Sequence, residues 1–319
     1  KSSISMSGFP RRRLVQAMAH KDVIGTTAVN WNFLLWRNPE NLSTRSILAL
    51  GFEPSKPLLV DSDFERKAET LKNKGRVLFD NQSRDEFGPI SSWFESGRLV
   101  ETEVAGKRVR VSGIVSLGPS FGADGNLITS RETYLGLSPG NPQGSIEIGL
   151  VRLKKGSDIE KVVRSLNLSL PSDVKVMSLK SFIDFEKNYW KSSTSIGFIF
   201  TLGAAMGFIV GCVIVYQILY SDVSDHLPEY ATLMAMGYNL RSLLAVVARE
   251  GFLLSIMGYI PAYLSGQALY SLVRSSTKLP VEMSFSRASI IFFLILFMCM
   301  GSALAAMKKL ADADPAEIF

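Results

Sequence analysis

The 25 residues from Ile196 to Tyr220 contain no charged side chain. At about 1.5 Å of rise per residue, a helix of this length measures roughly 37 Å and crosses a bilayer with some tilt. Aromatic side chains lie at both ends of the run, as they commonly do at membrane interfaces. Two further apolar segments follow at 242–273 and 289–307. The sequence therefore predicts three membrane-spanning helices.

Charged residues are distributed unevenly along the chain. Residues 1–192 contain 28 Lys/Arg and 21 Asp/Glu, whereas residues 193–319 contain 7 and 8. The first segment is typical of a water-exposed domain and the second of a membrane domain. We therefore predict a membrane α-helical protein with an α+β domain over 1–192 and a transmembrane domain over 193–319. This organisation excludes a purely soluble enzyme, a disordered chain and a disulfide-linked secreted domain.

Local patterns within 1–192 favour mixed α and β structure. Strand-like runs at 98–103 and 108–115 flank a short turn and predict a hairpin. Residues 146–177 read as a strand at 146–153, a helix at 157–166 that begins with short polar residues, and a strand at 174–177. A charge- and turn-rich stretch predicts an inserted subdomain at about 50–140.

An aromatic stripe at helical spacing precedes the first span. Phe182, Phe185 and Tyr189 are three and four residues apart, which predicts a helix that feeds into the membrane. A rigid helix continuous with the span would transmit force, and a simple packed connector is equally consistent with the stripe.

The sequence contains no recognisable catalytic motif. Phosphate-binding and dinucleotide-binding glycine patterns and the HExxH zinc motif are all missing, and the two histidines, His20 and His226, are far apart. Both cysteines, Cys212 and Cys299, lie in apolar stretches and predict neither a disulfide nor a metal site. We expect no enzyme activity, no cofactor and no metal in this chain. Arg11-Arg12-Arg13 is the one tight basic cluster, either a solvated helix end or a site for phosphate or lipid headgroups.

Three glycines in the first span predict close helix packing. Gly203, Gly207 and Gly211 recur every four residues and therefore lie on one helical face, where another helix can approach closely. The alternative is that glycine is simply common in membrane helices.

The loop between the first two spans predicts a short helix. Pro228 and Glu229 suit a first helical turn and Gly237 suits a C-cap, which gives about nine residues, too few to span a bilayer. Tyr230, Leu233 and Met234 would face the membrane helices and leave the other side chains for a partner. A helix that only lies in the lipid interface is the alternative.

The same region resembles a known family. EYATLMAMGY (229–238) before a span, and the terminal ADADPAEIF (311–319), are similar to the membrane subunits of MacB/FtsX-type ABC systems. Similarity to DevC-like permeases is closer and extends through segments along most of the chain, at 121–130, 182–190, 196–211 and 215–233.

The resemblance implies a four-span permease whose large domain is periplasmic and whose C-terminus is cytoplasmic, in the plasma membrane. The visible spans would be the second to fourth. Because the sequence starts at Lys1 without an initiator Met, we expect the full gene product to contain an upstream apolar segment of about 20 residues.

The resemblance also implies the functional residues. Segment 222–240 would be the cytoplasmic coupling helix, and the tail 308–319 would contain a second cytoplasmic motif. The residues implied for contact with the ATPase are His226, Leu227, Pro228, Glu229, Tyr230, Ala231, Thr232, Leu233, Met236, Gly237 and Tyr238, and those of the tail motif are Asp314, Pro315, Ala316 and Glu317.

The implied partners are a separate DevA-like ABC ATPase, a second permease copy, a DevB-like periplasmic adaptor, a TolC-like outer-membrane duct and membrane lipids, with no nucleic acid. Glycolipid export is the implied activity of DevC-type systems. An FtsX-like regulator of an external enzyme would keep the same fold without transport. A sensor or adhesion receptor, and an intrinsic membrane enzyme, fit the sequence less well. Lys and Arg counts on the two sides of the spans are equal and do not decide the orientation.

Overall fold

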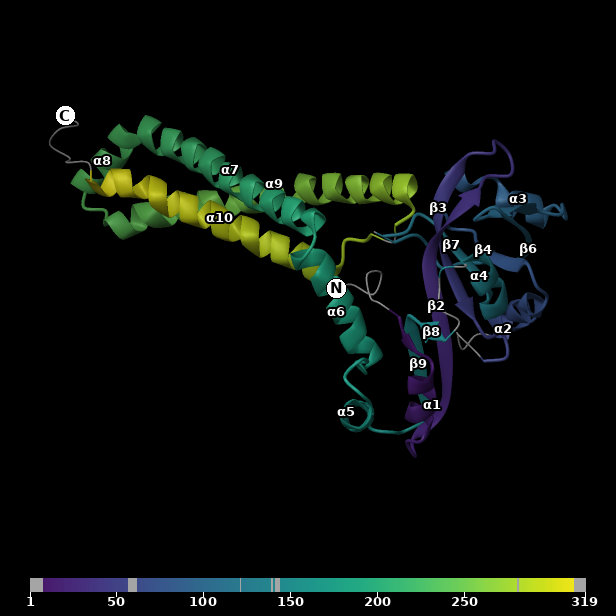
Figure 1. Cartoon of the computed structure of the whole chain (residues 1–319). Helices are drawn as coiled ribbons and strands as arrows, with labels where there is room; N and C mark the ends of the chain where they lie inside the picture. The colour runs from purple at the N-terminus through teal and green to yellow at the C-terminus, as the bar shows by residue number, and fades with distance from the viewer. Residues whose placement is uncertain are drawn as a thin grey trace. The chain divides into compact units, whose positions relative to one another are not determined.

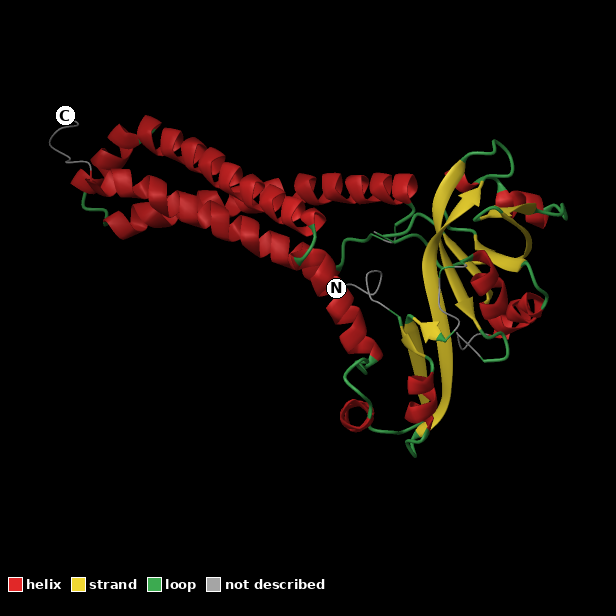
Figure 2. Cartoon of the chain, in the orientation of Figure 1, coloured by secondary structure: helices red, strands yellow, loops and turns green. Residues whose placement is uncertain are grey.

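A computed structural model describes residues 8–56, 62–120, 122–138, 140, 144–279 and 281–312. The chain divides into two compact units, each described here by itself (Figure 1). Unit 1 comprises Lys1–Trp190 with Ser276–Pro280, and unit 2 comprises Lys191–Ser275 with Val281–Phe319. Unit 1 contains a mixed sheet with helices, and unit 2 is helical (Figure 2).

Unit 1 is organised around one long strand, β2 (Val23–Arg37). Its first half pairs with β9, and its second half pairs with β3 and, near its end, with β5. The strand order β3-β7-β4-β6-β5-β2, with a further β2–β3 pairing, closes six strands into a small barrel. The other strands are β1 (Phe9–Pro10), β3 (Thr44–Phe52), β4 (Arg76–Asp80), β5 (Glu101–Val104), β6 (Lys107–Val115), β7 (Asn126–Ser130), β8 (Ser145–Ile146) and β9 (Ile148–Leu153).

The barrel strands bury their apolar side chains in one cluster. Trp36 is fully buried there, its ring centroid is 5.2 Å from that of Phe79, and its indole N–H donates to the Phe87 carbonyl oxygen at 3.0 Å. Alternating burial along β6 confirms the inward and outward facing expected of a strand with one covered face. Other members are Ile47, Ala49, Val77, Val104, Val109, Val111 and Leu127.

Short helices complete unit 1. Helix α4 begins where the Ser130 side chain accepts from the Thr133 N–H, an N-cap hydrogen bond. Asp158 caps α5 in the same way. The helices are α1 (Arg12–Met18), α2 (Ser62–Glu69), η2 (Thr70–Lys72), η3 (Asp85–Phe87), α3 (Ile90–Glu95), α4 (Arg131–Leu137), α5 (Ile159–Ser169) and α6 (Leu179–Ser192).

The hairpin and the helix predicted in unit 1 are confirmed, and one predicted strand is wrong. Strands β5 and β6 are antiparallel around Ala105 and Gly106, both with positive φ, a conformation that matches the twist of a two-residue hairpin. Residues 174–177 form no strand. The Asn167 side chain instead bonds the N–H and the carbonyl of Val176, which takes the place of a strand partner.

The inserted subdomain predicted at about 50–140 does not form a sheet of its own. Strands β4 to β7 belong to the same barrel as β3 and the second half of β2. The sheet therefore continues across the predicted boundary.

The helix before the membrane is not continuous with the first span. Helix α6 ends at Ser192, and α7 begins at Ser195 with Thr194 as its own N-cap, whose side chain accepts from the Gly197 N–H at 3.3 Å. The backbone of Thr194 is extended, with φ −119° and ψ 151°. The predicted helix continuous from unit 1 into the first span is therefore interrupted between Ser192 and Ser195.

Unit 2 contains the three predicted spans, and all three are confirmed as helices long and apolar enough to cross a membrane. They are α7 (Ser195–Asp225), α9 (Leu240–Thr277) and α10 (Phe285–Asp312), with the short α8 (Leu227–Ala235) between the first two. Helix α7 packs along α10, where the Ser302 hydroxyl donates to the Cys212 carbonyl oxygen at 3.2 Å. Helix α9 also contacts α10, through the Tyr259 hydroxyl, which donates to the Ala288 carbonyl oxygen at 3.1 Å. The chain thus combines an α+β unit with a membrane-helical unit.

Candidate functional site

Helix α8 is the nine-residue helix that the sequence predicts between two spans. Pro228 lies in its first turn, where no intrahelical N–H is needed. At its end, Gly237 has φ +94°, its N–H donates to the Met234 carbonyl oxygen at 3.0 Å, and the Tyr238 N–H donates to the Leu233 carbonyl oxygen at 3.1 Å. This pair of bonds is a Schellman cap, which glycine favours because it lacks a Cβ. Both ends of α8 are therefore defined by the local sequence.

One face of α8 packs against the spans. Tyr230 is 9% exposed and Ala231 is 1% exposed. Tyr230 belongs to a cluster whose other members come from the end of α7, the start of α9 and the end of α10 (Figure 1). The residues that pack against α8 were not predicted as part of the site, because they are ordinary apolar residues far apart in sequence. They are Leu219, Val223, Leu243, Val247, Ala303 and Ala306.

The opposite face of α8 is open. Glu229 has 73% of its side chain exposed, Met236 is 64% exposed and Tyr238 is 56% exposed. Pro228 and Thr232 are exposed as well. Pro228, Glu229, Thr232 and Met236 recur at three- and four-residue spacing, and Tyr238 follows the C-cap of the helix. We call these five exposed residues the α8 outer face.

Burial affects four of the residues that the resemblance implies for contact with the ATPase: Tyr230 and Ala231 are buried, and Leu227 and Leu233 are partly buried against the cluster of membrane-helix residues. Ala231 is 1% exposed and is not available to a partner. Tyr230 and Leu233 belong to the packed face as the sequence predicts. The four predicted residues of the tail motif, Asp314 to Glu317, lie outside the described residues.

His226 joins α7 to α8 and has acidic neighbours on both helices. Its Nδ1 is 3.0 Å from the Glu229 Oε2, and its Nε2 is 4.0 Å from the Asp222 Oδ1. The hydrogen bond to Glu229, followed by the negative charge of that carboxylate, raises the pKa of His226 above its ordinary value. The sequence indicates the Asp222 contact, because Asp222 precedes His226 by four residues, the spacing at which helical side chains meet.

We expect His226 to titrate above the ordinary histidine value of about 6.5. Because the pKa is raised in the folded state, protonated His226 stabilises the start of α8 at pH values below the ordinary pKa. That contribution is lost as pH rises through the raised value. An NMR titration of the imidazole, assigned with a His226→Gln variant, measures the midpoint. Glu229→Gln should lower it, and an unchanged midpoint in that variant would contradict the assignment to Glu229.

The glycine face of α7 is only partly covered within this chain. A Cβ at Gly211 would lie 2.9 Å from the Met298 sulfur of α10, so that glycine packs against α10. A Cβ at Gly203 or Gly207 would meet nothing within 4 Å. None of the most apolar window of α7 is buried. A close contact at Gly203 and Gly207 would therefore involve another molecule.

Gly207→Leu tests that contact. If Gly207 lies against a second copy, the leucine side chain separates the two helices, and we expect disulfide or chemical cross-linking between copies in the membrane to fall severalfold. Leu202→Phe, an enlargement on the same exposed helix, is a control expected to leave cross-linking unchanged. Equal cross-linking in Gly207→Leu and the parent would place this face against lipid.

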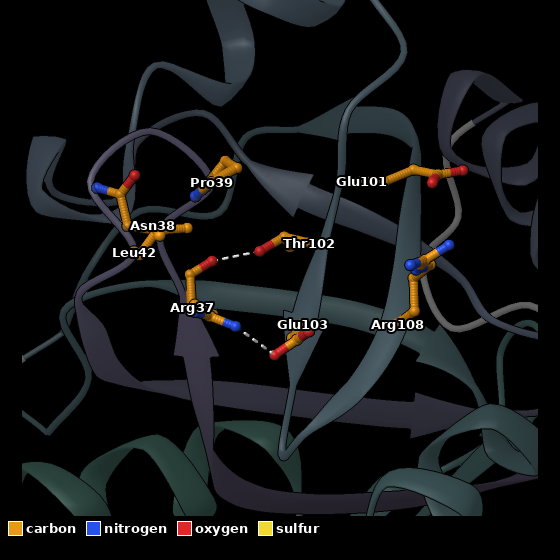
Figure 3. Close-up of a pocket in the computed structure, with 8 residues that line it drawn as sticks. All are labelled: Arg37, Asn38, Pro39, Leu42, Glu101, Thr102, Glu103 and Arg108. Atoms are coloured by element: carbon orange, nitrogen blue, oxygen red, sulfur yellow. Dashed lines mark hydrogen bonds and ion pairs between the residues drawn. The ribbon is translucent and has the colours of Figure 1, made fainter.

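A polar cavity of about 320 Å³ lies in unit 1, between the β2–β3 turn and strands β5 and β6 (Figure 3). Three of its four charged lining residues, Arg37, Glu101 and Glu103, form ion pairs. Arg37 pairs with Glu103 at 3.0 Å, and Glu101 pairs with Arg110 at 2.7 Å. The Thr102 hydroxyl donates to the Arg37 carbonyl oxygen. The contacts of Arg37 hold β2 to β5, and the Glu101–Arg110 pair holds β5 to β6. We therefore interpret the cavity as a structural junction between strands.

The described part of the chain contains no candidate metal site. Within it, no three His, Cys, Asp or Glu side chains gather in a way that would hold a metal ion. Both cysteines are free. The candidate site is therefore α8, a short, capped helix that lies between two spans and has one exposed face.

Comparison with known families bears on the unit that contains this helix. Residues 189–315 match the family described as FtsX-like permease C-terminal. The match contains α7, α8, α9 and α10, and it leaves residues 1–188 outside. No curated protein matches the chain.

Three solved structures share low similarity with the chain. The extracellular domain of the noncanonic ABC-type transporter YknZ from Gram-positive bacteria is 17% identical, with 54% of this chain and 90% of that chain covered and a TM-score of 0.36. The periplasmic region of MacB from Actinobacillus actinomycetemcomitans is 14% identical, with 58% and 85% covered and a TM-score of 0.38. A domain of a putative permease protein from Porphyromonas gingivalis is 15% identical, with 48% and 67% covered and a TM-score of 0.28.

Proposed function

We propose that the chain is the permease subunit of an ABC exporter and that ATP is hydrolysed on a separate ATPase subunit. The family match of residues 189–315 supports a permease role for unit 2. The observation on which the proposal mainly rests is α8, a capped helix too short to span, packed by one face on three membrane helices and open on the other.

The α8 outer face is suited to contact with a partner protein. It combines an exposed carboxylate at Glu229 with two exposed side chains that favour interfaces, Met236 and Tyr238. Because Tyr230 fixes the other face to the spans, a force on α8 reaches the ends of α7 and α9 directly.

Both of these helices lead back to unit 1. Helix α7 connects through Ser193 and Thr194 to α6, and the last two residues of α9 belong to Ser276–Pro280, which is part of unit 1. Within unit 1 the Lys278 ammonium binds the Asp85 carboxylate at 2.5 Å and the Ser83 carbonyl oxygen at 3.1 Å. ATP-driven closure of a partner dimer would thus shift two helices whose other ends lead into unit 1. This is the mechanotransmission that we propose.

The finer assignment follows the DevC resemblance. With α8 in the cytoplasm, unit 1 is periplasmic, since α7 crosses the membrane once between them. We propose that two permease copies work with a periplasmic adaptor and an outer-membrane duct, and that the exported compound is a glycolipid. An FtsX-like regulator of an external enzyme is the alternative, because the description of the matched family accommodates both.

Purification of the tagged chain from its native membrane in mild detergent tests the proposal. Mass spectrometry should identify a nucleotide-binding ATPase and a coiled-coil adaptor in the same complex. A wall hydrolase in place of the adaptor would favour the regulator. Recovery of the intact chain without any ATPase, under conditions that preserve a known membrane complex, would contradict the proposal.

A further inference from the structure

A second cavity in unit 1, of about 290 Å³, lies between α1 and β2. It includes two members of the basic cluster, Arg11 and Arg12, together with Lys56 from a distant part of the chain. Glu53 binds Arg11 and also pairs with Lys56 at 3.1 Å. Arg11 and Lys56 therefore share one carboxylate, and Arg12 adds a third cation to the lining, which leaves this side of the cavity with a net positive charge.

Arg12 is the cation most available to a ligand. Its side chain is exposed, and it has no hydrogen bond or ion pair with any residue that the structure describes. Arg11 is held in place by Glu53. A guanidinium group binds phosphate or carboxylate oxygens through two parallel N–H donors. The cationic side of the cavity is thus suited to an anionic headgroup.

The rest of the cavity is apolar. Leu14 and Ala28 are buried in its floor, where they pack together. Val15 is 68% exposed and Met18 is 51% exposed, both on the side of α1 that lines the cavity. Two exposed apolar side chains beside a buried apolar floor are suited to a short stretch of alkyl chain.

One buried polar group also lines the cavity. Thr26 of β2 is 8% exposed, and its hydroxyl has no hydrogen-bond partner among the described residues. This hydroxyl is not among the enclosed side-chain atoms that lack a hydrogen-bond partner, so it stays accessible and can form a hydrogen bond with a ligand oxygen. This is an observation independent of the charges, and it points to a ligand with polar atoms close to its chain.

We propose that the cavity between α1 and β2 binds a single-chain amphiphile with an anionic headgroup. The headgroup lies against Arg11, Arg12 and Lys56, and the first carbons of the chain lie over Leu14, Val15 and Met18. The volume is at the lower end of the range for small-molecule sites, so the chain beyond these carbons remains outside. The site lies in unit 1 and needs no ATPase, so its test is separate from that of the proposed permease function.

Decyl phosphate is the probe, added to the full chain in phosphatidylcholine nanodiscs. The readout is the methyl NMR signal of Met18, labelled with carbon-13 and assigned by its loss in Met18→Leu. We expect a saturable shift with decyl phosphate and none with inorganic phosphate or with the neutral amphiphile decyl maltoside. Arg12→Glu should weaken binding by about tenfold or more, since a charge-assisted contact becomes repulsive. Thr26→Val should weaken it by a smaller factor.

Lys155→Glu is the matched control, because Lys155 is an exposed cation without a partner among the described residues and lies outside the cavity. It should bind decyl phosphate like the parent. The proposal is overturned if Arg12→Glu also binds like the parent. It is equally overturned if inorganic phosphate alone shifts Met18 to the same extent, or if decyl maltoside binds as tightly as decyl phosphate.

Discussion

Replacing Trp36 with alanine is expected to destabilise unit 1 by about 3–5 kcal/mol, the usual cost of removing a buried tryptophan. Trp36 is fully buried in the barrel and contacts Phe79. Its indole N–H also satisfies the Phe87 carbonyl oxygen, which would be left without this donor. A loss of this size is a large part of the stability of a typical domain.

Hydrogen exchange of the β6 amides measures the effect in the full chain. Amides that exchange through unfolding of the barrel should exchange about 10²- to 10⁴-fold faster in Trp36→Ala. Leu35→Ala is the control on the same strand, because Leu35 is 59% exposed. Its effect should be within about 0.5 kcal/mol. Equal exchange rates in the two variants would mean that the barrel core does not depend on Trp36.

The second large effect is expected on the α8 outer face. Glu229→Lys and Met236→Arg each place a new cation on this surface, at positions that are exposed and do not support the packed face. If the ATPase subunit binds there, we expect both its stimulation by the permease and export to fall by at least about tenfold, as for repulsive charges placed in an interface. Unit 1 should fold normally in both variants.

Glu282→Lys is the matched control for charge reversal. Glu282 is 75% exposed in its side chain, close to the 73% of Glu229, and each has one ion pair. Glu282 follows α9, one candidate span away from α8, so the proposed topology places it on the opposite side of the membrane. It should retain ATPase stimulation. Ala231→Arg is not informative, because Ala231 is buried and the change would disturb packing. Normal stimulation and export in both outer-face variants would contradict the coupling role.

The membrane helices and α8 could be predicted from the sequence because their signals are local. The span at α7 is a long uncharged run, and the ends of α8 follow from Pro228 and Gly237. Even the inward face of α8 follows from the spacing of Tyr230 and Leu233. The sequence was sufficient to predict those elements whose two ends are set by residues within or next to the element itself.

The rest depends on contacts between residues far apart. The closure of the barrel requires β2 to pair with β9, β3 and β5 along one 15-residue strand, and nothing in the pattern of β2 itself indicates three partners. Residues 174–177 were predicted as a strand, but there the Asn167 side chain forms the hydrogen bonds with Val176 that a neighbouring strand would have formed. The cavity beside Arg12 depends on Lys56, which is 44 residues away. Sequence spacing alone contains no information on such pairs.

Site-specific photo-cross-linking from position 236 is the most direct test of the central claim. A photoreactive amino acid replaces Met236 on the α8 outer face in the native membrane. A second variant carries it at Phe293 of α10, which is equally exposed at 64% but lies within a span. The coupling role predicts a cross-link to an ATPase subunit from position 236 and none from position 293. A cross-link only to lipid from position 236, in membranes that contain the assembled complex, would contradict it.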